Sequence, residues 1–135
     1  MSFRIITRPP RSIVSAPPVD SDPTTLQSFL DDAAHYPGGH AAGVVFPRSE
    51  ADVSAILREH RRVLPIGAQS SVTGGATPRG EVVLSTSKMA AILEIGDDFA
   101  RVQPGLPLVT LKETLATQGR YNPPAPTYDG AFVGG

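Results

Sequence analysis

The segment at residues 67–76, Gly-Ala-Gln-Ser-Ser-Val-Thr-Gly-Gly-Ala, most constrains what this chain can fold into. It has little apolar surface to bury and follows a short apolar run, which predicts a loop at the end of a strand. Its glycines allow positive φ angles and a close backbone approach to a ligand. Backbone N–H groups gathered in one concavity, with Ser and Thr hydroxyls nearby, suit a diphosphate. A flexible surface loop without a ligand is the alternative.

The loop does not match the two commonest nucleotide-binding patterns. A P-loop ends in Gly-Lys-Ser or Gly-Lys-Thr, and this loop contains neither Lys nor Arg. The dinucleotide fingerprint needs Gly-x-Gly-x-x-Gly between a strand and a helix. Here Ala68 and Gln69 break that spacing, and the next apolar run is strand-like. A Rossmann-type enzyme is therefore disfavoured, and neutral donors alone would bind the phosphates.

The flanking segments predict an α+β (α/β) fold in which helices flank a small, partly parallel β-sheet. Apolar runs predict strands at 43–46, 63–66 and 81–85, and a hairpin of strands at 89–95 and 99–103 around a turn at 96–98. Apolar spacing predicts helices at 24–34, 50–60 and from 108 to beyond 115, with Ser49 as the N-cap of the second. The first helix would place Asp31 and Asp32 opposite its apolar face. The order strand, helix, strand over 43–66 predicts parallel pairing through a right-handed crossover.

Composition narrows the partners. A net charge of -1 over 135 residues gives no concentrated excess of Lys and Arg, so we expect no nucleic-acid surface. The chain has no Cys, which excludes a disulfide framework, and its apolar runs are too short to span a bilayer. We predict a flexible, Pro-rich lead-in at 1–21 and one domain at 22–135. We expect a cytoplasmic protein, with organelle targeting by residues 1–19 as the alternative.

Residues 65–76 resemble the pyrophosphate loop of the FAD-binding domain in the vanillyl-alcohol oxidase and p-cresol methylhydroxylase (PCMH) superfamily. Other segments are similar to pieces of that domain in the same order, at 44–53, 83–95, 102–105, 123–127 and 133–135. Each piece alone is a weak pattern, whereas the ordered set is specific. The resemblance covers residues 22–135 and implies the first subdomain of a PCMH-type domain plus the start of the second. It also implies a domain that is incomplete at its C-terminal end.

The resemblance implies FAD as the cofactor and two groups of contact residues. The first group would contact the diphosphate and nearby atoms: Pro65, Ile66, Gly67, Ala68, Gln69, Ser70, Ser71, Val72, Thr73, Gly74 and Gly75. The second would approach the flavin or its ribityl chain: Pro124, Pro126, Thr127, Gly134 and Gly135.

The same resemblance bears on the mode of FAD attachment. Some members attach FAD through His or Cys, and the corresponding loop here has neither. This implies non-covalent FAD, as in the branch similar to glycolate oxidase, D-lactate dehydrogenase and alkyldihydroxyacetonephosphate synthase. Many relatives carry Gly or Gly-Thr where this chain has Ala68-Gln69-Ser70, which leaves the branch open. The larger Gln69 could fill space near the phosphates or donate to them.

The implied function is a flavin-dependent oxidoreductase, an oxidase or dehydrogenase that transfers hydride from a hydroxy-acid or alcohol carbon to flavin. The scattered His35, His40 and His60 show no metal-ligand spacing, and no catalytic base stands out. We therefore expect a small-molecule substrate to be handled by a domain downstream of Gly135, and this piece to be inactive alone. We also expect self-association through its unfinished edge. The alternative is a stand-alone, non-catalytic nucleotide-binding or interaction module.

Overall fold

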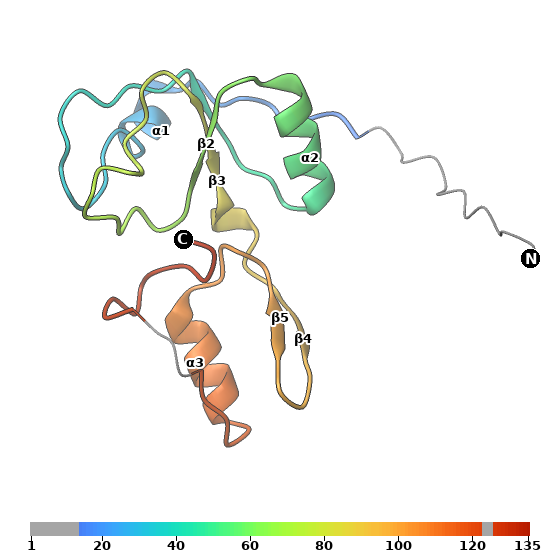
Figure 1. Cartoon of the computed structure of the whole chain (residues 1–135). Helices are drawn as coiled ribbons and strands as arrows, with labels where there is room; N and C mark the ends of the chain where they lie inside the picture. Colours follow the sequence, from blue (N-terminus) through green and yellow to red (C-terminus); the bar gives the residue numbers. More distant parts are fainter. Residues whose placement is uncertain (1–13, 123–125) are drawn as a thin grey trace, which may run out of the picture.

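The computed structural model describes residues 14–122 and 126–135. Figure 1 shows two parts, which we call the sheet region (residues 14–88) and the hairpin region (residues 89–135, as far as described). A three-stranded sheet forms the sheet region, and a β-hairpin packed on one helix forms the hairpin region. The mixed α/β fold class with a small parallel sheet is therefore confirmed.

The sheet contains β1 (Gly43–Val45), β2 (Val63–Ile66) and β3 (Val82–Ser85), in the order β1-β3-β2 and parallel throughout. The predicted strands are confirmed, but the predicted direct pairing of the first two is wrong, because β3 lies between them. All four residues of β3 are buried, which suits the centre of a sheet. Pro65 in β2 has no N–H to donate, and a proline is tolerated on an edge strand.

The two faces of the sheet carry separate cores, as the alternation of side chains along a strand requires. Val45, Val82 and Leu84 pack with Ile56 of α2 (Glu50–Glu59), whereas Val44, Ile66 and Val83 pack on the other face. The predicted cap of α2 is confirmed, since Ser49 accepts a hydrogen bond from the amide of Asp52. The Asp52 carboxylate accepts in return from the amide of Ser49.

The first helix is shorter than the sequence pattern predicts. α1 spans Pro23–Gln27, capped by the Asp22 side chain, so the predicted continuation to residue 34 is wrong. Beyond Gln27 the carbonyls of Ser28 and Asp31 accept hydrogen bonds from the Gln69 side chain instead of from helical amides. The chain turns, and Asp32, expected on a polar helix face, is buried with 3% of its surface exposed.

The hairpin region begins after a short 3₁₀ turn, η1 (Thr86–Lys88). The predicted hairpin is confirmed with shorter strands, β4 (Ile92–Ile95) and β5 (Ala100–Val102), joined by a turn in which Gly96 donates to the Phe99 carbonyl at 2.9 Å. The predicted third helix is α3 (Leu108–Ala116), which packs Leu111 and Leu115 against the hairpin.

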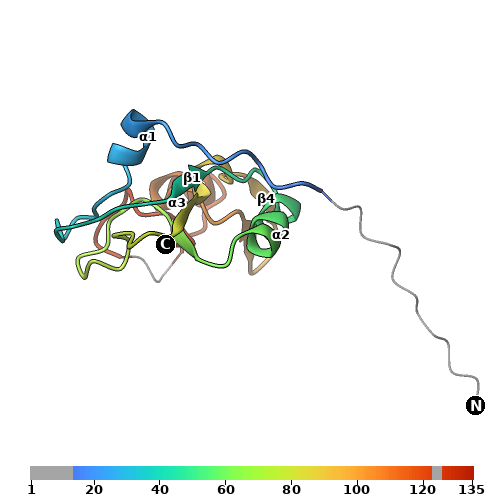
Figure 2. The same ribbon diagram turned by 90° about the horizontal axis from the view of Figure 1, so that it is seen from above.

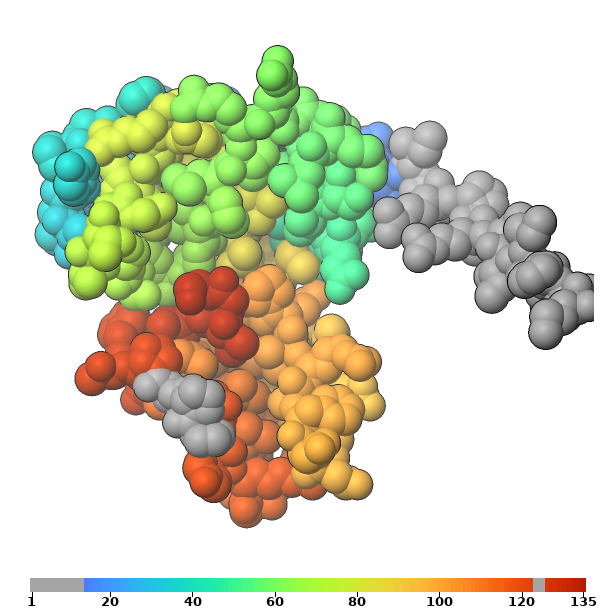
Figure 3. Space-filling model, in the orientation of Figure 1, coloured from blue at the N-terminus to red at the C-terminus, as the bar shows by residue number. Residues whose placement is uncertain are grey.

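Both ends of the described chain return to these regions. Asp20 and Val44 exchange two backbone hydrogen bonds of 2.8 Å, so residues 14–20 run beside β1 and reach α2, as Figure 2 shows. Whether the domain begins at residue 22 stays a prediction. At the other end, Val133 donates to Leu106 and Gly134 to Pro104. Figure 3 shows these last residues, in dark red, at the waist between the two regions.

Candidate functional site

The loop at residues 67–76 leaves the carboxyl end of β2 and returns toward β3, which is the edge where parallel sheets commonly bind ligands. Two of its residues have left-handed backbone conformations, Gln69 at φ 55° and Gly74 at φ 76°. Gly74 suits that conformation because it has no Cβ, and the Tyr36 ring lies against its Cα. These positive φ angles turn the backbone sharply at two points of the loop.

The loop presents donors that the rest of the described chain does not use. The amides of Ser70, Ser71, Val72, Gly74 and Gly75 donate to no described residue. The Ser71 and Thr73 hydroxyl oxygens lie 3.1 Å apart. A Cβ placed on Gly75 would lie 3.6 Å from each of these oxygens, so the glycine leaves the backbone beside the two hydroxyls uncovered. Unpaired amides with two hydroxyls beside them are donors suited to an anion.

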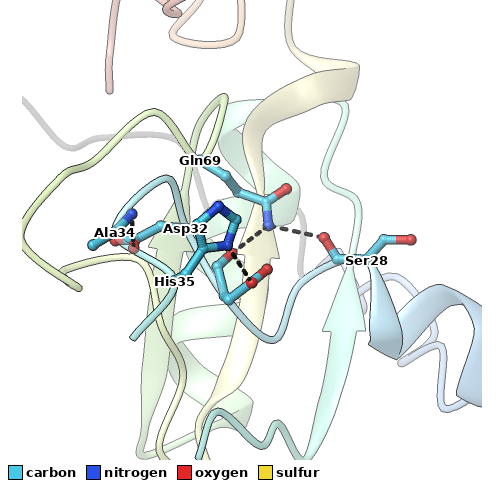
Figure 4. A network of polar contacts seen from close by, with 6 residues as sticks. Ser28, Asp32, Ala34, His35 and Gln69 are labelled. Atoms are coloured by element: carbon cyan, nitrogen blue, oxygen red, sulfur yellow. Dashed lines mark hydrogen bonds and ion pairs between the residues drawn. The ribbon is translucent and has the colours of Figure 1, made fainter. Parts of the chain in front are cut away.

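Residues that follow α1 hold the loop in place through hydrogen bonds to Gln69. The Gln69 side-chain nitrogen donates to the carbonyls of Ser28 at 2.8 Å and Asp31 at 2.9 Å, as Figure 4 shows. The Gln69 carbonyl accepts from the amide of Ala33 at 3.0 Å. The side chain of Gln69 thus points toward residues 28–33. Near it, the His35 Nδ1 lies 3.1 Å from the Asp31 carboxylate, and both side chains are exposed.

Asp32 is a site residue that sequence reasoning missed. Its carboxylate accepts from the amides of Ala34 at 3.0 Å and Ala76 at 3.2 Å. Burial would raise the pKa of Asp32, but these amide hydrogen bonds and one from Ser71 outweigh it and hold the pKa below its ordinary value. Asp32 is therefore ionised at neutral pH. No local signal points to its contact with the loop, because Ala76 lies 44 residues away in the sequence.

Of the described residues predicted to approach the flavin, only the last, Gly135, lies close to the loop, beside Gly67. A Cβ on Gly67 would lie 3.3 Å from the Cα of Gly135, and one on Gly134 would lie 2.5 Å from the Cβ of Pro104. Pro126 and Thr127 are exposed and form no hydrogen bond with the loop, and Pro124 lies outside the described residues. Ile66 is buried in the core, so only its backbone faces the loop, whereas Pro65 is exposed. In residues 14–122 and 126–135, no cluster of three or more His, Asp or Glu is placed to hold a metal ion.

Comparison with known proteins places this geometry in context. The family model described as "FAD binding domain" matches residues 41–135. The mitochondrial D-lactate dehydrogenase (cytochrome) of Arabidopsis thaliana is 36% identical over 101 residues, which cover 68% of this chain and 17% of that protein. The glycolate oxidase subunit GlcD of Bacillus subtilis (strain 168) is 34% identical over 91 residues, covering 62% of this chain and 19% of that protein.

A solved structure, that of a chitooligosaccharide oxidase, shares the fold. It superposes with a TM-score of 0.70 and 20% identity over 87% of this chain and 26% of the other. The chain thus spans about a fifth of the length of the curated relatives it matches.

Proposed function

The chain belongs to the family of FAD binding domains, and from that premise we propose that the loop at residues 67–76 binds the FAD diphosphate. The observation that carries this assignment is the set of unpaired amides around Gly75, with the Ser71 and Thr73 hydroxyls beside them. A diphosphate would accept from these amides, which have no acceptor among the described residues, and from the two hydroxyls beside them. No competing dinucleotide fingerprint or P-loop is present in the sequence.

Gly135 lies close to Gly67, so the proposed site includes the C-terminal segment as well as the phosphate-binding loop. With no side chain at either position, backbone atoms of the sheet region and of the C-terminal segment come together beside the loop. We assign Gly134 and Gly135 to the ribityl and flavin side of the cofactor, together with Pro124, Pro126 and Thr127 when the cofactor is bound. FAD supplies the ring that accepts a hydride. The residues of this chain bind and orient that cofactor without a covalent bond.

We further propose that the complete protein oxidises a hydroxy acid or alcohol by hydride transfer to flavin. The support is the likeness to proteins named for D-lactate and glycolate. Because the matches cover only 17% and 19% of those relatives, we assign this chain the cofactor and assign substrate binding and catalysis to the complete protein. We place the protein in the cytoplasm, and the mitochondrial relative makes organelle targeting the alternative. Among the described residues no helix has the length and apolarity needed to cross a membrane.

Self-association of this chain is the remaining part of the proposal. Leu93 and Phe99 on the hairpin expose 55% and 47% of their surface. A groove of about 500 Å³ between the hairpin turn and α3 is lined by Phe99, Leu111 and Leu115 together with the charged residues Asp97, Asp98 and Arg120. A two-stranded hairpin also leaves strand edges open, which favours pairing with a second copy. Sedimentation equilibrium should show a dimer or larger species, and a monomer at every concentration would contradict it.

The diphosphate assignment is tested by titrating the purified chain with FAD, ADP and FMN. FAD should bind saturably and raise the melting temperature, ADP should compete, and FMN, which lacks the diphosphate bridge, should bind far more weakly. Gly75→Asp should abolish binding because its carboxylate would face the phosphates, whereas the isosteric Gly75→Asn controls for bulk. Equal affinities for FMN and FAD, or unchanged FAD affinity in Gly75→Asp, would overturn the assignment.

A further inference from the structure

Gln69 has a backbone conformation that needs support. A residue other than glycine rarely has φ near 55°, and such conformations persist where surrounding contacts over-determine them. The contacts here come from the residues that follow α1: the side-chain nitrogen donates to Ser28 and Asp31, and the main-chain carbonyl accepts from Ala33. A primary amide offers two N–H groups from one nitrogen, so it can satisfy two carbonyls at once. A glutamate side chain of the same length offers none when ionised.

Asp32 binds the same loop at a further point. Its carboxylate accepts from the amide of Ala76, at the end of the loop, at 3.2 Å. Residues 28–33 therefore hold the loop near its start and at its end. The hydrogen bonds that hold the loop use the backbone amides of Ala33, Ala34 and Ala76 as donors. The amides of residues 70–72 and 74–75 therefore remain without a partner among the described residues.

From this arrangement we infer that Gln69 and Asp32 are positioning residues: they fix the loop at residues 67–76 in its anion-binding shape before any cofactor arrives. The inference rests on the proposed function for the meaning of that shape. Neither side chain is assigned a contact with phosphate. Their effect on affinity is indirect, because a loop that is already ordered loses less conformational freedom on binding than a mobile one.

Substitutions at Gln69 separate its two contributions. Gln69→Glu keeps the length but replaces two donors by a carboxylate facing two carbonyls. Gln69→Ala removes the side-chain contacts and keeps the backbone strain, whereas Gln69→Gly removes the contacts and relieves the strain. We expect the FAD Kd to rise about tenfold or more for the Glu and Ala variants, and less for the Gly variant. Gln118→Glu, at an exposed position after α3, is the matched control and should leave the Kd unchanged.

The pH profile of Gln69→Glu gives a readout that loss of packing would not move. Protonation of the carboxylate introduced in this variant would restore one donor, so its FAD affinity should recover on lowering the pH from about 8 to about 5, relative to wild type and Gln69→Ala. The charged and titratable groups that face position 69 are Asp31, Asp32 and His35. These groups are present in all variants, so comparison with wild type removes their contribution to the pH dependence of FAD affinity.

Amide hydrogen exchange without FAD tests the inference independently of cofactor binding. The amides of Ala33, Ala34 and Ala76, which donate to Gln69 and Asp32, should exchange faster in Gln69→Glu and Gln69→Ala than in wild type and Gln118→Glu, while amides of β3 stay unchanged. Unchanged exchange and unchanged FAD affinity in these variants would overturn the inference and leave the proposed function standing. If wild type binds no FAD, the proposed function fails, and the exchange rates alone decide whether Gln69 positions the loop.

Discussion

The sheet region and the hairpin region close their cores to different degrees. Val44, Val45, Ile56 and Val83 have no exposed surface, and both faces of their sheet are covered. In the hairpin region Leu106, Leu111 and Leu115 are buried, but the hairpin residues that pack against them are only partly buried. A parallel sheet covered on both faces is stable by itself, whereas a two-stranded hairpin needs further packing. The candidate cofactor loop therefore extends from the better-packed region.

The candidate site lies where these two regions meet. The loop at residues 67–76 belongs to the sheet region, and Gly134 and Gly135 return from the hairpin region. The junction is tight, since a Cβ on Gly105 would lie 1.9 Å from the Thr86 carbonyl oxygen. A site built across two regions of unequal packing depends on the junction as much as on the loop.

The largest effect is expected at that junction. Gly105→Ala would force its new methyl group into the Thr86 and Met89 carbonyls, which are backbone atoms that cannot rotate away. We expect a loss of about 3 kcal/mol or more in the free energy of unfolding, measured by urea denaturation. Gly119→Ala is the contrast, because its Cβ would meet nothing within 4 Å and only its φ of 67° is unfavourable. Equal losses for the two would show that the junction is loosely packed.

The next effect compares the two cores directly. Ile56→Ala leaves a cavity beneath the sheet and should cost about 4 kcal/mol, whereas Leu111→Ala should cost about 2 kcal/mol because its neighbours are partly exposed and can relax. Denaturant unfolding followed by circular dichroism measures both. A larger cost for Leu111→Ala would reverse the comparison and make the hairpin region the better-packed one.

A smaller effect is expected from acid, and it concerns the sheet region. The depressed pKa of Asp32 means that ionised Asp32 stabilises the fold above its unfolded pKa of about 3.9, and that this stability is lost as pH falls through the lower native pKa. Asp32→Asn should be less stable than wild type at pH 7 and should lose less stability between about pH 4 and pH 2. Thermal melts across this range measure the difference. Parallel pH profiles would contradict the role given to Asp32.

The smallest effect is expected on the hairpin surface. Arg101 and Glu94 form an ion pair at 2.9 Å whose side chains are 66% and 49% exposed. Such pairs contribute little, so Arg101→Ala should change the unfolding free energy by at most about 0.5 kcal/mol. A double-mutant cycle with Glu94→Ala isolates the pair. A coupling well above this value would mean that the hairpin depends on its surface charges rather than on Leu106, Leu111 and Leu115.

Local patterns predicted most of the fold. The Ser49 cap, the apolar runs of β2 and β3 and the turn at Gly96 each depend on neighbours within a few residues, so one sequence is enough to find them. Non-local competition explains the two errors. β3 lies between β1 and β2 although it follows both in the sequence, and α1 ends early because Gln69, about forty residues away, binds the carbonyls of Ser28 and Asp31.

The same limit applies to the candidate site. Glycine and hydroxyl content predicted the loop as a diphosphate site, and the structure adds its unpaired amides and the approach of Gly67 to Gly135. The residues next to Asp32 in the sequence give no sign that its carboxylate binds the loop. Its role depends on where residue 76 folds back, which composition and periodicity do not encode.

The most direct test of the diphosphate assignment is an amide chemical-shift map of the ¹⁵N-labelled chain, recorded while FAD is added. We expect the largest changes on the unpaired amides of residues 70–72 and 74–75, followed by Gly135, whereas the amides of β4 and β5 should hardly shift. Repeating the titration with ADP should reproduce the changes in the loop. Saturable FAD binding whose shifts fall outside residues 67–76 would contradict the central claim.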